Sequence, residues 1–299
     1  MFENLRVIFE IVLTVAFIIS VVTYVIYRLT FAREVKANIA ANRANLASLE
    51  KKERKSLRHH LLAQVINTPY RKTVYFFADL FWVLLLVVVV RGFFFEPFII
   101  PSGSMKPGLQ VDDIVLVNKY DKGLRMPITN TRLTDGNPIK RGDVLVFKFP
   151  DNPKIAYIKR VIGLPGDKVY YDNRNMMING KPVALQKAGA ENDEVEVKTR
   201  QGIARQDEGF TVYNETLPEN ATHTIRYANN FRAGYPAKDW TIPAGKYLMM
   251  GDNRDQSADG REFGLLDDQL IIGKASHIAF NWGCLKGDGG CDRFFKKIQ

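Results

Sequence analysis

The sequence predicts two N-terminal transmembrane helices followed by a mainly antiparallel β domain. Two long apolar stretches lie within the first 90 residues, and a strongly basic segment separates them. The rest of the chain alternates short apolar runs with turn-forming residues. The chain has 299 residues, of which 46% are hydrophobic and 25% charged, so it can bury a sizeable core and is not globally disordered.

The first apolar stretch covers residues 7–27. Its 21 residues can cross a hydrocarbon core of about 30 Å at roughly 1.5 Å per residue. A cleavable signal peptide is the competing interpretation, but Arg6 is the only basic residue ahead of the stretch. Arg28 and Arg33 also follow it where a small-residue cleavage site would be expected. We therefore assign residues 1–30 to a first transmembrane segment.

The segment at 31–72 carries most of the net charge. From residue 28 to 72, eleven Lys and Arg against three acidic residues contribute +8 of the chain's +10. Because positive residues accumulate on the cytoplasmic side of a membrane, this loop is predicted to be cytoplasmic and the chain beyond about Gly92 to lie across the membrane. With the charge concentrated here, a basic nucleic-acid groove on the folded domain is not expected. Residues 35–65 are predicted to be helical, with Pro69 ending the helix.

The second apolar stretch covers residues 74–90. Its 17 residues are at the short end for a span, and Asp79 lies inside it, so a buried core helix is the alternative. The stretch is followed by Arg91 and by three phenylalanines at 93–95, a pattern typical of an interfacial aromatic belt. We assign residues 73–91 to a second transmembrane segment.

Residues 92–299 are predicted to form the β domain, on short β-branched and aromatic runs bounded by Gly, Pro, Asn and Asp. Asn179-Gly180 marks a tight hairpin. The segment 184–243 is more polar and less patterned, and we expect a peripheral insertion there. The predicted strands lie at 114–117, 144–147, 157–162, 168–171 and 246–250.

The two cysteines, Cys284 and Cys291, form no metal-binding pattern. They are either small buried residues or a disulfide closing a glycine-rich loop, and the disulfide requires a domain outside the cytoplasm. No metal and no organic cofactor is expected.

Histidine-based serine hydrolysis is not predicted. His59 and His60 lie in the basic segment, His223 and His277 lie in no known motif, and the chain has no GxSxG elbow.

Ser102-Gly103-Ser104 follows the second apolar stretch closely. The ordinary interpretation of two serines flanking a glycine is a turn. The functional one is a nucleophile on a tight exposed turn, where backbone N–H groups can face an oxyanion.

A nucleophilic serine needs a base, and Lys159 is the candidate. By strand alternation it shares a face with Ile155, Tyr157 and Val161, so its amine would be held against apolar surface. Such burial lowers a lysine pKa, by up to about 3–5 units when complete. A lysine extending from the strand into solvent is the alternative.

The segment 251–261 is dense in hydrogen-bonding side chains and directly follows a predicted strand. It is either a solvated loop with local ion pairs or a rigid polar scaffold that orients the base, as a third group orients the histidine of a triad. An EF-hand loop is disfavoured by Arg254, Arg261 and the missing ligand spacing.

Together, the segments at 102–105, 157–167 and 251–264, in that order behind the second apolar stretch, resemble the bacterial type I signal peptidases (leader peptidases), which use a Ser–Lys dyad. The resemblance implies that Ser104 is the nucleophile and Lys159 the general base. It places the oxyanion hole at Ser102 and the Ser104 N–H. It further implies supporting roles for Ser257, which would orient the amine, for Asp259 paired with Arg261, and for Asp252 and Arg160, and substrate pockets lined by Phe98, Ile100, Met105 and Ile158.

The resemblance also implies the function of a membrane-bound serine endopeptidase that cleaves signal peptides from secreted pre-proteins after A-x-A residues, through an acyl-enzyme. The alternative is a catalytically inactive membrane scaffold or chaperone for exported precursors. The expected partners are signal peptides, the lipid bilayer and the nearby secretion machinery, with no nucleic acid. The expected location is the inner (cytoplasmic) membrane, multi-pass, with the catalytic domain on the periplasmic face.

Overall fold

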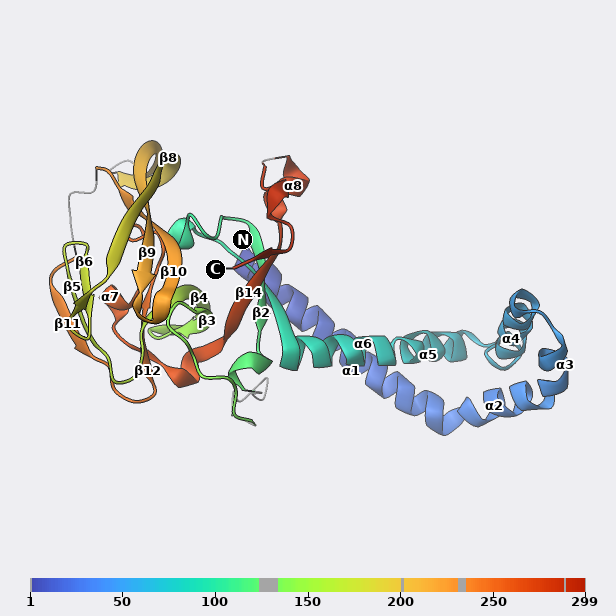
Figure 1. Cartoon of the computed structure of the whole chain (residues 1–299). Helices are drawn as coiled ribbons and strands as arrows, with labels where there is room; N and C mark the ends of the chain where they lie inside the picture. The colour runs from blue at the N-terminus through green and yellow to red at the C-terminus, as the bar shows by residue number, and fades with distance from the viewer. Residues whose placement is uncertain (1, 124–133, 200–201, 231–234, 288, 299) are drawn as a thin grey trace. The chain divides into compact units, whose positions relative to one another are not determined.

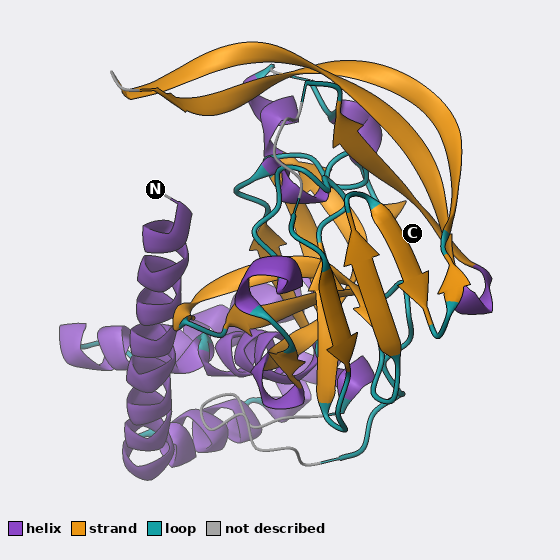
Figure 2. Cartoon of the chain, turned by 90° about the vertical axis from the view of Figure 1, so that its left-hand side faces the viewer, coloured by secondary structure: helices purple, strands orange, loops and turns teal. Residues whose placement is uncertain are grey.

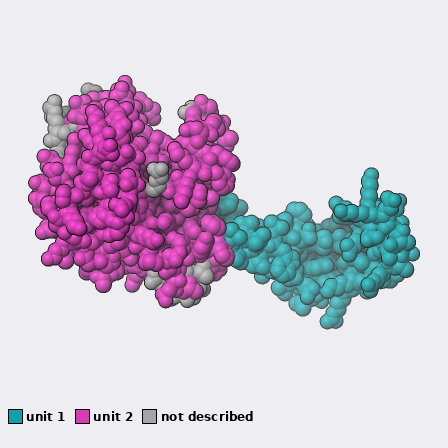
Figure 3. Space-filling model, in the orientation of Figure 1, with its two compact units in different colours: residues 1–91 teal, residues 92–299 magenta. Residues whose placement is uncertain are grey.

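The computed structural model describes residues 2–123, 134–199, 202–230, 235–287 and 289–298. The chain divides into two compact units, Met1–Arg91 and Gly92–Gln299 (Figure 3). Each unit is described by itself.

The first unit is helical. Helix α1 packs along α5 and α6, and the ring of Tyr24 on α1 stacks on that of Phe81 on α6 with centroids 4.4 Å apart. The basic segment between the apolar stretches is helical as predicted, but it is broken in two places into the helices α2, α3 and α4 (Figure 1). The elements are α1 Phe2–Thr30, α2 Ala32–Ala41, α3 Arg43–Ser48, α4 Lys51–Val65, α5 Pro69–Asp79, α6 Phe81–Val89 and the π-helical turn Val90–Phe94.

Among the described residues, two helical stretches are long and apolar enough to cross a membrane, Ile8–Thr30 and Pro69–Phe94. The predicted order of two apolar N-terminal helices and a β domain is thus confirmed. The second stretch has 26 residues, more than predicted, because Pro69 begins a helix and does not end one. Thr68 Oγ1 accepts a hydrogen bond from the Arg71 N–H, and proline is favoured in the first turn, where its missing N–H costs nothing.

The second unit is built on an eight-stranded antiparallel sheet, in the order β1-β2-β14-β3-β4-β12-β13 with β15 on β14. Strand β2 alternates between buried and half-exposed residues, whereas β3, β4 and β12 contain runs of consecutive buried residues. Their sequences could be recognised as short β-branched and aromatic runs bounded by turn residues. The strands are β1 Phe95–Ile99, β2 Asp113–Asn118, β3 Val144–Phe149, β4 Asn152–Gly163, β12 Lys246–Met250, β13 Leu266–Asp267, β14 Ile271–Asn281 and β15 Lys296–Lys297.

A four-stranded sheet has the order β11-β5-β6-β7, with β5 Lys168–Asp172, β6 Asn175–Ile178, β7 Lys181–Pro182 and β11 Lys238–Thr241. Asn179 and Gly180 join β6 to β7 with φ values of 52° and 75°, the left-handed backbone that the tight hairpin predicted there requires.

A three-stranded sheet, in the order β10-β9-β8, occupies most of the expected insertion. It consists of β8 Ala184–Thr199, β9 Gly202–Leu217 and β10 Ala221–Ala228, and β8 and β9 form a long curved hairpin (Figure 2). This segment is peripheral only in part. Glu215, His223 and Arg226 are buried at its inner end.

Short helical elements connect the strands. Helix α8 runs over Trp282–Lys286, and Cys284 and Cys291 are joined as a disulfide around a turn in which Gly287, Gly289 and Gly290 have positive φ. The others are α7 Gly260–Phe263 and the 3₁₀ turns Gly103–Met105, Tyr120–Lys122, Pro218–Asn220, Asp268–Leu270 and Cys291–Arg293.

Candidate active site

Ser104 and Lys159 meet in the second unit. Ser104 lies on the 3₁₀ turn Gly103–Met105 and Lys159 on β4, and Lys159 Nζ is 2.7 Å from Ser104 Oγ, within hydrogen-bonding distance. Ser104 is 9% exposed and Lys159 4%. The structure therefore brings together the two residues on which the sequence hypothesis rests. It also corrects the expected exposed turn in part, because Ser104 and Met105 are buried while Ser102 is exposed and Gly103 half-buried.

The amine of Lys159 has an apolar surrounding, as the alternation of β4 predicted. Leu145 on β3 is its cross-strand partner, and Nζ lies 5.2 Å from the centre of the Tyr157 ring. Burial lowers the pKa of Lys159 to about 8, while the charges of Asp259 and Asp252 limit the decrease. A substantial fraction of this amine is neutral near pH 8 and can accept a proton.

The turn that carries Ser104 is anchored by the segment 251–261. The N–H of Asn253 donates to the Ser104 carbonyl at 3.1 Å, and its Nδ2 donates to the Gly103 carbonyl at 3.0 Å. A Cβ on Gly251 would lie 2.6 Å from the Ser104 carbonyl oxygen, so only glycine allows this approach. No role was predicted for Asn253, because the sequence does not show which of the many polar side chains in 251–261 reaches the turn.

Ser102 lies beside the predicted nucleophile. Its Oγ is 3.4 Å from Ser104 Oγ. Ser102 has an extended backbone and directly precedes the 3₁₀ turn. The hydroxyl is thus within a few ångströms of any group that Ser104 attacks.

Asp259 and Arg261 form a fully buried ion pair. Arg261 Nη2 donates to Asp259 Oδ2 at 2.8 Å, and the same carboxylate accepts the Gly251 N–H at 2.9 Å. Arg261 also donates to the Arg254 carbonyl at 2.6 Å. Burial raises the pKa of Asp259, but its bonds to Arg261 outweigh this and hold the pKa below its usual range. The segment is therefore a rigid scaffold and not a solvated loop.

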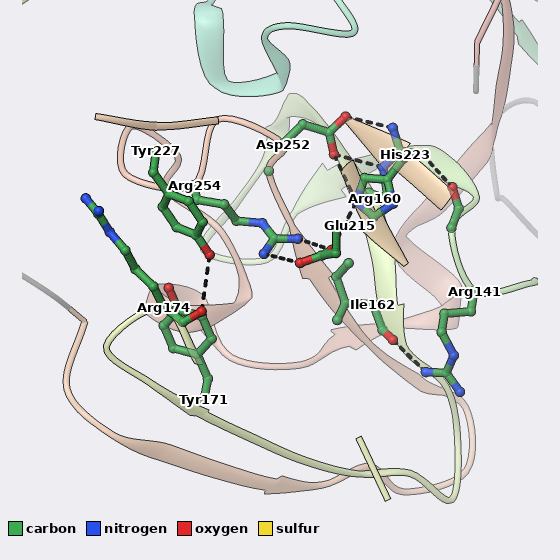
Figure 4. Close-up of polar contacts among 12 residues, drawn as sticks. Arg141, Arg160, Ile162, Tyr171, Arg174, Glu215, His223, Tyr227, Asp252 and Arg254 are labelled. Carbon is green, nitrogen blue, oxygen red and sulfur yellow. Dashed lines mark hydrogen bonds and ion pairs between the residues drawn. The ribbon is translucent and has the colours of Figure 1, made fainter. Parts of the chain in front are cut away.

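Arg160 and Asp252 form a second buried pair (Figure 4). Arg160 Nε and Nη2 donate to the two carboxylate oxygens of Asp252 at 2.8 and 2.7 Å, a bidentate geometry. Arg160 Nη1 also donates to the Gly142 carbonyl at 2.8 Å. Because Arg160 follows Lys159 on β4, this pair fixes the strand next to the amine.

Ser257 does not make the predicted bond to Lys159. Its Oγ is buried and has no hydrogen-bond partner within the described ranges. The side chain packs closely on Gly251, where an added Cβ would lie 2.1 Å from Oγ, and the Lys159 amine donates to Ser104.

Three buried polar residues near the scaffold have no role that was predicted from the sequence. Arg254 pairs with Glu215 of β9 through both guanidinium Nη atoms, and His223 Nε2 of β10 lies 3.1 Å from Glu215 Oε2 (Figure 4). Burial raises the pKa of Glu215, but Arg254 and His223 lower it to about 2. These contacts join residues up to 39 positions apart, and nothing local in the sequence indicates them.

The predicted substrate-lining residues lie in one apolar cluster. All four are at most 8% exposed, and the cluster includes Leu109 and Val144. The four are Phe98, Ile100, Met105 and Ile158, and Met105 directly follows Ser104.

Comparison with known proteins decides the family. The family model described as signal peptidase, peptidase S26, matches residues 73–280. The chain is 42% identical to signal peptidase I of Pseudomonas aeruginosa over 213 residues, which are 68% of this chain and 70% of that protein. The chain belongs to this family.

Other signal peptidase I proteins are similar over the same region or more. The protein of Pseudomonas fluorescens is 41% identical over 68% of this chain and 70% of its own length. That of Buchnera aphidicola is 34% identical over 76% of this chain and 81% of its own. The match includes the second apolar stretch and all three predicted segments, so the resemblance to signal peptidases, a family of serine endopeptidases, is confirmed.

Proposed function

We propose that this signal peptidase is anchored in the membrane by its two apolar helices and removes signal peptides through a Ser104–Lys159 dyad. The observation that carries the proposal is the buried 2.7 Å contact between the serine hydroxyl and an amine with a pKa near 8. A neutral amine at this distance can act as the general base that activates the serine hydroxyl.

In acylation, neutral Lys159 takes the proton of Ser104 as Oγ attacks the carbonyl carbon of the scissile bond. The oxyanion accepts hydrogen bonds from the Ser104 N–H and the Ser102 hydroxyl. The C–N bond then breaks, the Lys159 ammonium returns its proton to the leaving amine of the mature protein, and the signal peptide remains as an ester on Ser104.

In deacylation, Lys159 takes a proton from a water molecule that attacks the ester carbonyl. The C–Oγ bond breaks, Ser104 regains a proton from Lys159, and the signal peptide leaves with a carboxyl end. The pairs Asp259–Arg261 and Arg160–Asp252 hold β4 and the scaffold in place through both steps.

The apolar cluster beside Ser104 supports cleavage after A-x-A. Phe98, Ile100, Met105 and Ile158 pack together there, and we propose that they bind the small side chains of the cleavage site. Small residues at these positions are the mark of signal-peptide cleavage sites.

We further propose a multi-pass location in the cytoplasmic (inner) membrane, with the β unit on the periplasmic face and the secretion machinery nearby. The basic loop supports this orientation through the positive-inside rule. The Cys284–Cys291 disulfide is compatible with an oxidising compartment.

A cleavage assay with the purified full chain in lipid vesicles and a pre-protein substrate tests the dyad. We expect cleavage after A-x-A by the wild type, and a loss of at least about 1,000-fold in kcat for Ser104→Ala and for Lys159→Met. Lys154→Met, an exposed lysine on the same strand, is the matched control and should behave as wild type.

Substantial cleavage by either folded dyad variant contradicts the mechanism. Binding of the precursor without cleavage by the wild type would instead favour the scaffold or chaperone alternative.

A further inference from the structure

Lys106 stands two residues after Ser104, at the end of the 3₁₀ turn. Its side chain lies back over the turn, since a Cβ on Gly103 would lie 3.4 Å from Lys106 Cδ. Its amine donates to both carboxylate oxygens of Asp193, at 2.8 and 2.6 Å. Asp193 belongs to β8, so the long hairpin reaches the turn that carries the nucleophile.

Asp193 is also held from its other side. Its Oδ2 accepts a hydrogen bond at 2.8 Å from Nη2 of Arg226, a β10 residue that is 2% exposed. The Arg226 guanidinium further donates to Glu191 at 2.7 Å and lies 3.8 Å from the centre of the Phe210 ring. The side chain of Arg226 is therefore fixed in one place.

The backbone of Arg226 closes a ring of contacts. Its N–H donates to the Asp252 carbonyl at 3.0 Å, and its carbonyl accepts the Arg254 N–H at 3.1 Å. Between them, Asn253 donates to the Ser104 carbonyl at 3.1 Å. The turn is thus tied to β10 twice, through the scaffold on one side and through Lys106 and Asp193 on the other.

We infer that Asp193 is a positioning residue for the nucleophile: it holds Lys106, and so restrains the turn on the side that the scaffold does not reach. The inference rests on the proposed function. Asp193 stays ionised for this task, because Lys106 and Arg226 lower its pKa by more than burial raises it. A misplacement of about 1 Å at a reacting group can cost roughly 100-fold in rate.

The test is steady-state kinetics of the full chain in vesicles with Asp193→Asn. We expect kcat to fall about 10- to 100-fold, with KM within twofold of wild type and the pH midpoint of the reaction unchanged. Asp193→Glu keeps the carboxylate and should stay within about threefold of the wild-type kcat. The matched control is Glu194→Gln, the next residue on β8, whose side chain is 57% exposed.

Lys106→Met removes the Lys106–Asp193 contact by changing the residue on the turn. This variant replaces Asp193→Asn in the assay if Asp193→Asn does not fold. Because both variants remove one interaction, the double variant should be no slower than the slower single variant. A kcat within twofold of wild type for the folded variants overturns the inference, as does a multiplicative loss in the double variant. If the wild type itself cleaves no precursor, the proposed function fails instead.

Discussion

Lys159 connects burial to chemistry most directly. Its amine must be neutral to take the Ser104 proton, and burial brings its pKa to about 8. We expect kcat/KM to rise with pH to a plateau with a midpoint near 8 and to be roughly 100-fold lower at pH 6, where about 1% of the amine is neutral. A profile measured from pH 6 to 9.5 checks this, and a rate that is constant from pH 7 to 9 would exclude Lys159 as the base.

The same burial has a cost in folding. The pKa of Lys159 lies below its ordinary 10.5, so between pH 8 and 10.5 the folded chain binds fewer protons than the unfolded chain. The free energy of unfolding therefore rises with pH through that window, and below pH 8 the cost is present in full. We expect Lys159→Met to raise the free energy of unfolding at pH 7, by up to about 3 kcal/mol, since a tenfold change in acidity corresponds to about 1.4 kcal/mol.

Denaturation of both proteins in one detergent, at pH 7 and at pH 10.5, measures this difference. The stabilisation should shrink at the higher pH. A variant that is less stable than the wild type at pH 7 would show that the amine contributes more through its contact with Ser104 than its burial costs.

At the residue level the sequence predicted much of the candidate site. Lys159 was recognisable because strand alternation places it on an apolar face, whereas the pairing of Asp259 with Arg261 was implied by the family resemblance. Ser257 and Asn253 were not predictable in detail. Whether Asn253 or Ser257 reaches the turn that carries Ser104 depends on how the segment 251–261 packs around Gly251.

Among the elements, β9 supplies a carboxylate on which the scaffold depends. Glu215→Gln leaves the fully buried Arg254 without a counter-charge, and loss of one partner of a buried pair costs about 3–5 kcal/mol. We expect the variant to unfold at lower temperature and to lose activity in proportion. Asp207→Asn, an exposed position on the same strand, should change neither.

Low pH should destabilise the protein through the same Glu215–Arg254 pair. Because the pKa of Glu215 is about 2 and not its ordinary 4.5, the stability that Glu215 contributes is present above pH 4.5 and is lost as the pH falls toward 2. A Glu215→Gln variant with wild-type stability at pH 7 would show that Arg254 finds another partner.

The central sheet was predictable because its strands are short β-branched and aromatic runs bounded by turn residues. The hairpin of β8 and β9 was not, because most of β8 is exposed and its few buried contacts are made by charged residues. A polar strand of this kind has no apolar period to recognise, and its position is set by ion pairs with distant residues.

For the whole molecule, the basic loop and the β unit are predicted to lie on opposite sides of the membrane. A cysteine introduced at Arg54 should be protected from a membrane-impermeant thiol reagent added to intact cells, and one at Lys181 should be labelled. Both positions are exposed, and the two native cysteines are engaged with each other in the structure. Labelling of both sites, or of the first alone, would contradict the orientation.

The length of Pro69–Phe94 has one more consequence. As a continuous helix its 26 residues measure about 39 Å, roughly 9 Å more than an average hydrocarbon core. In the proposed membrane anchor, a span of this length must lean or carry about six residues beyond the hydrocarbon. Thicker bilayers would absorb the excess and thinner ones would increase the lean, so the acyl-chain length of the host lipid becomes a physical variable acting on this helix.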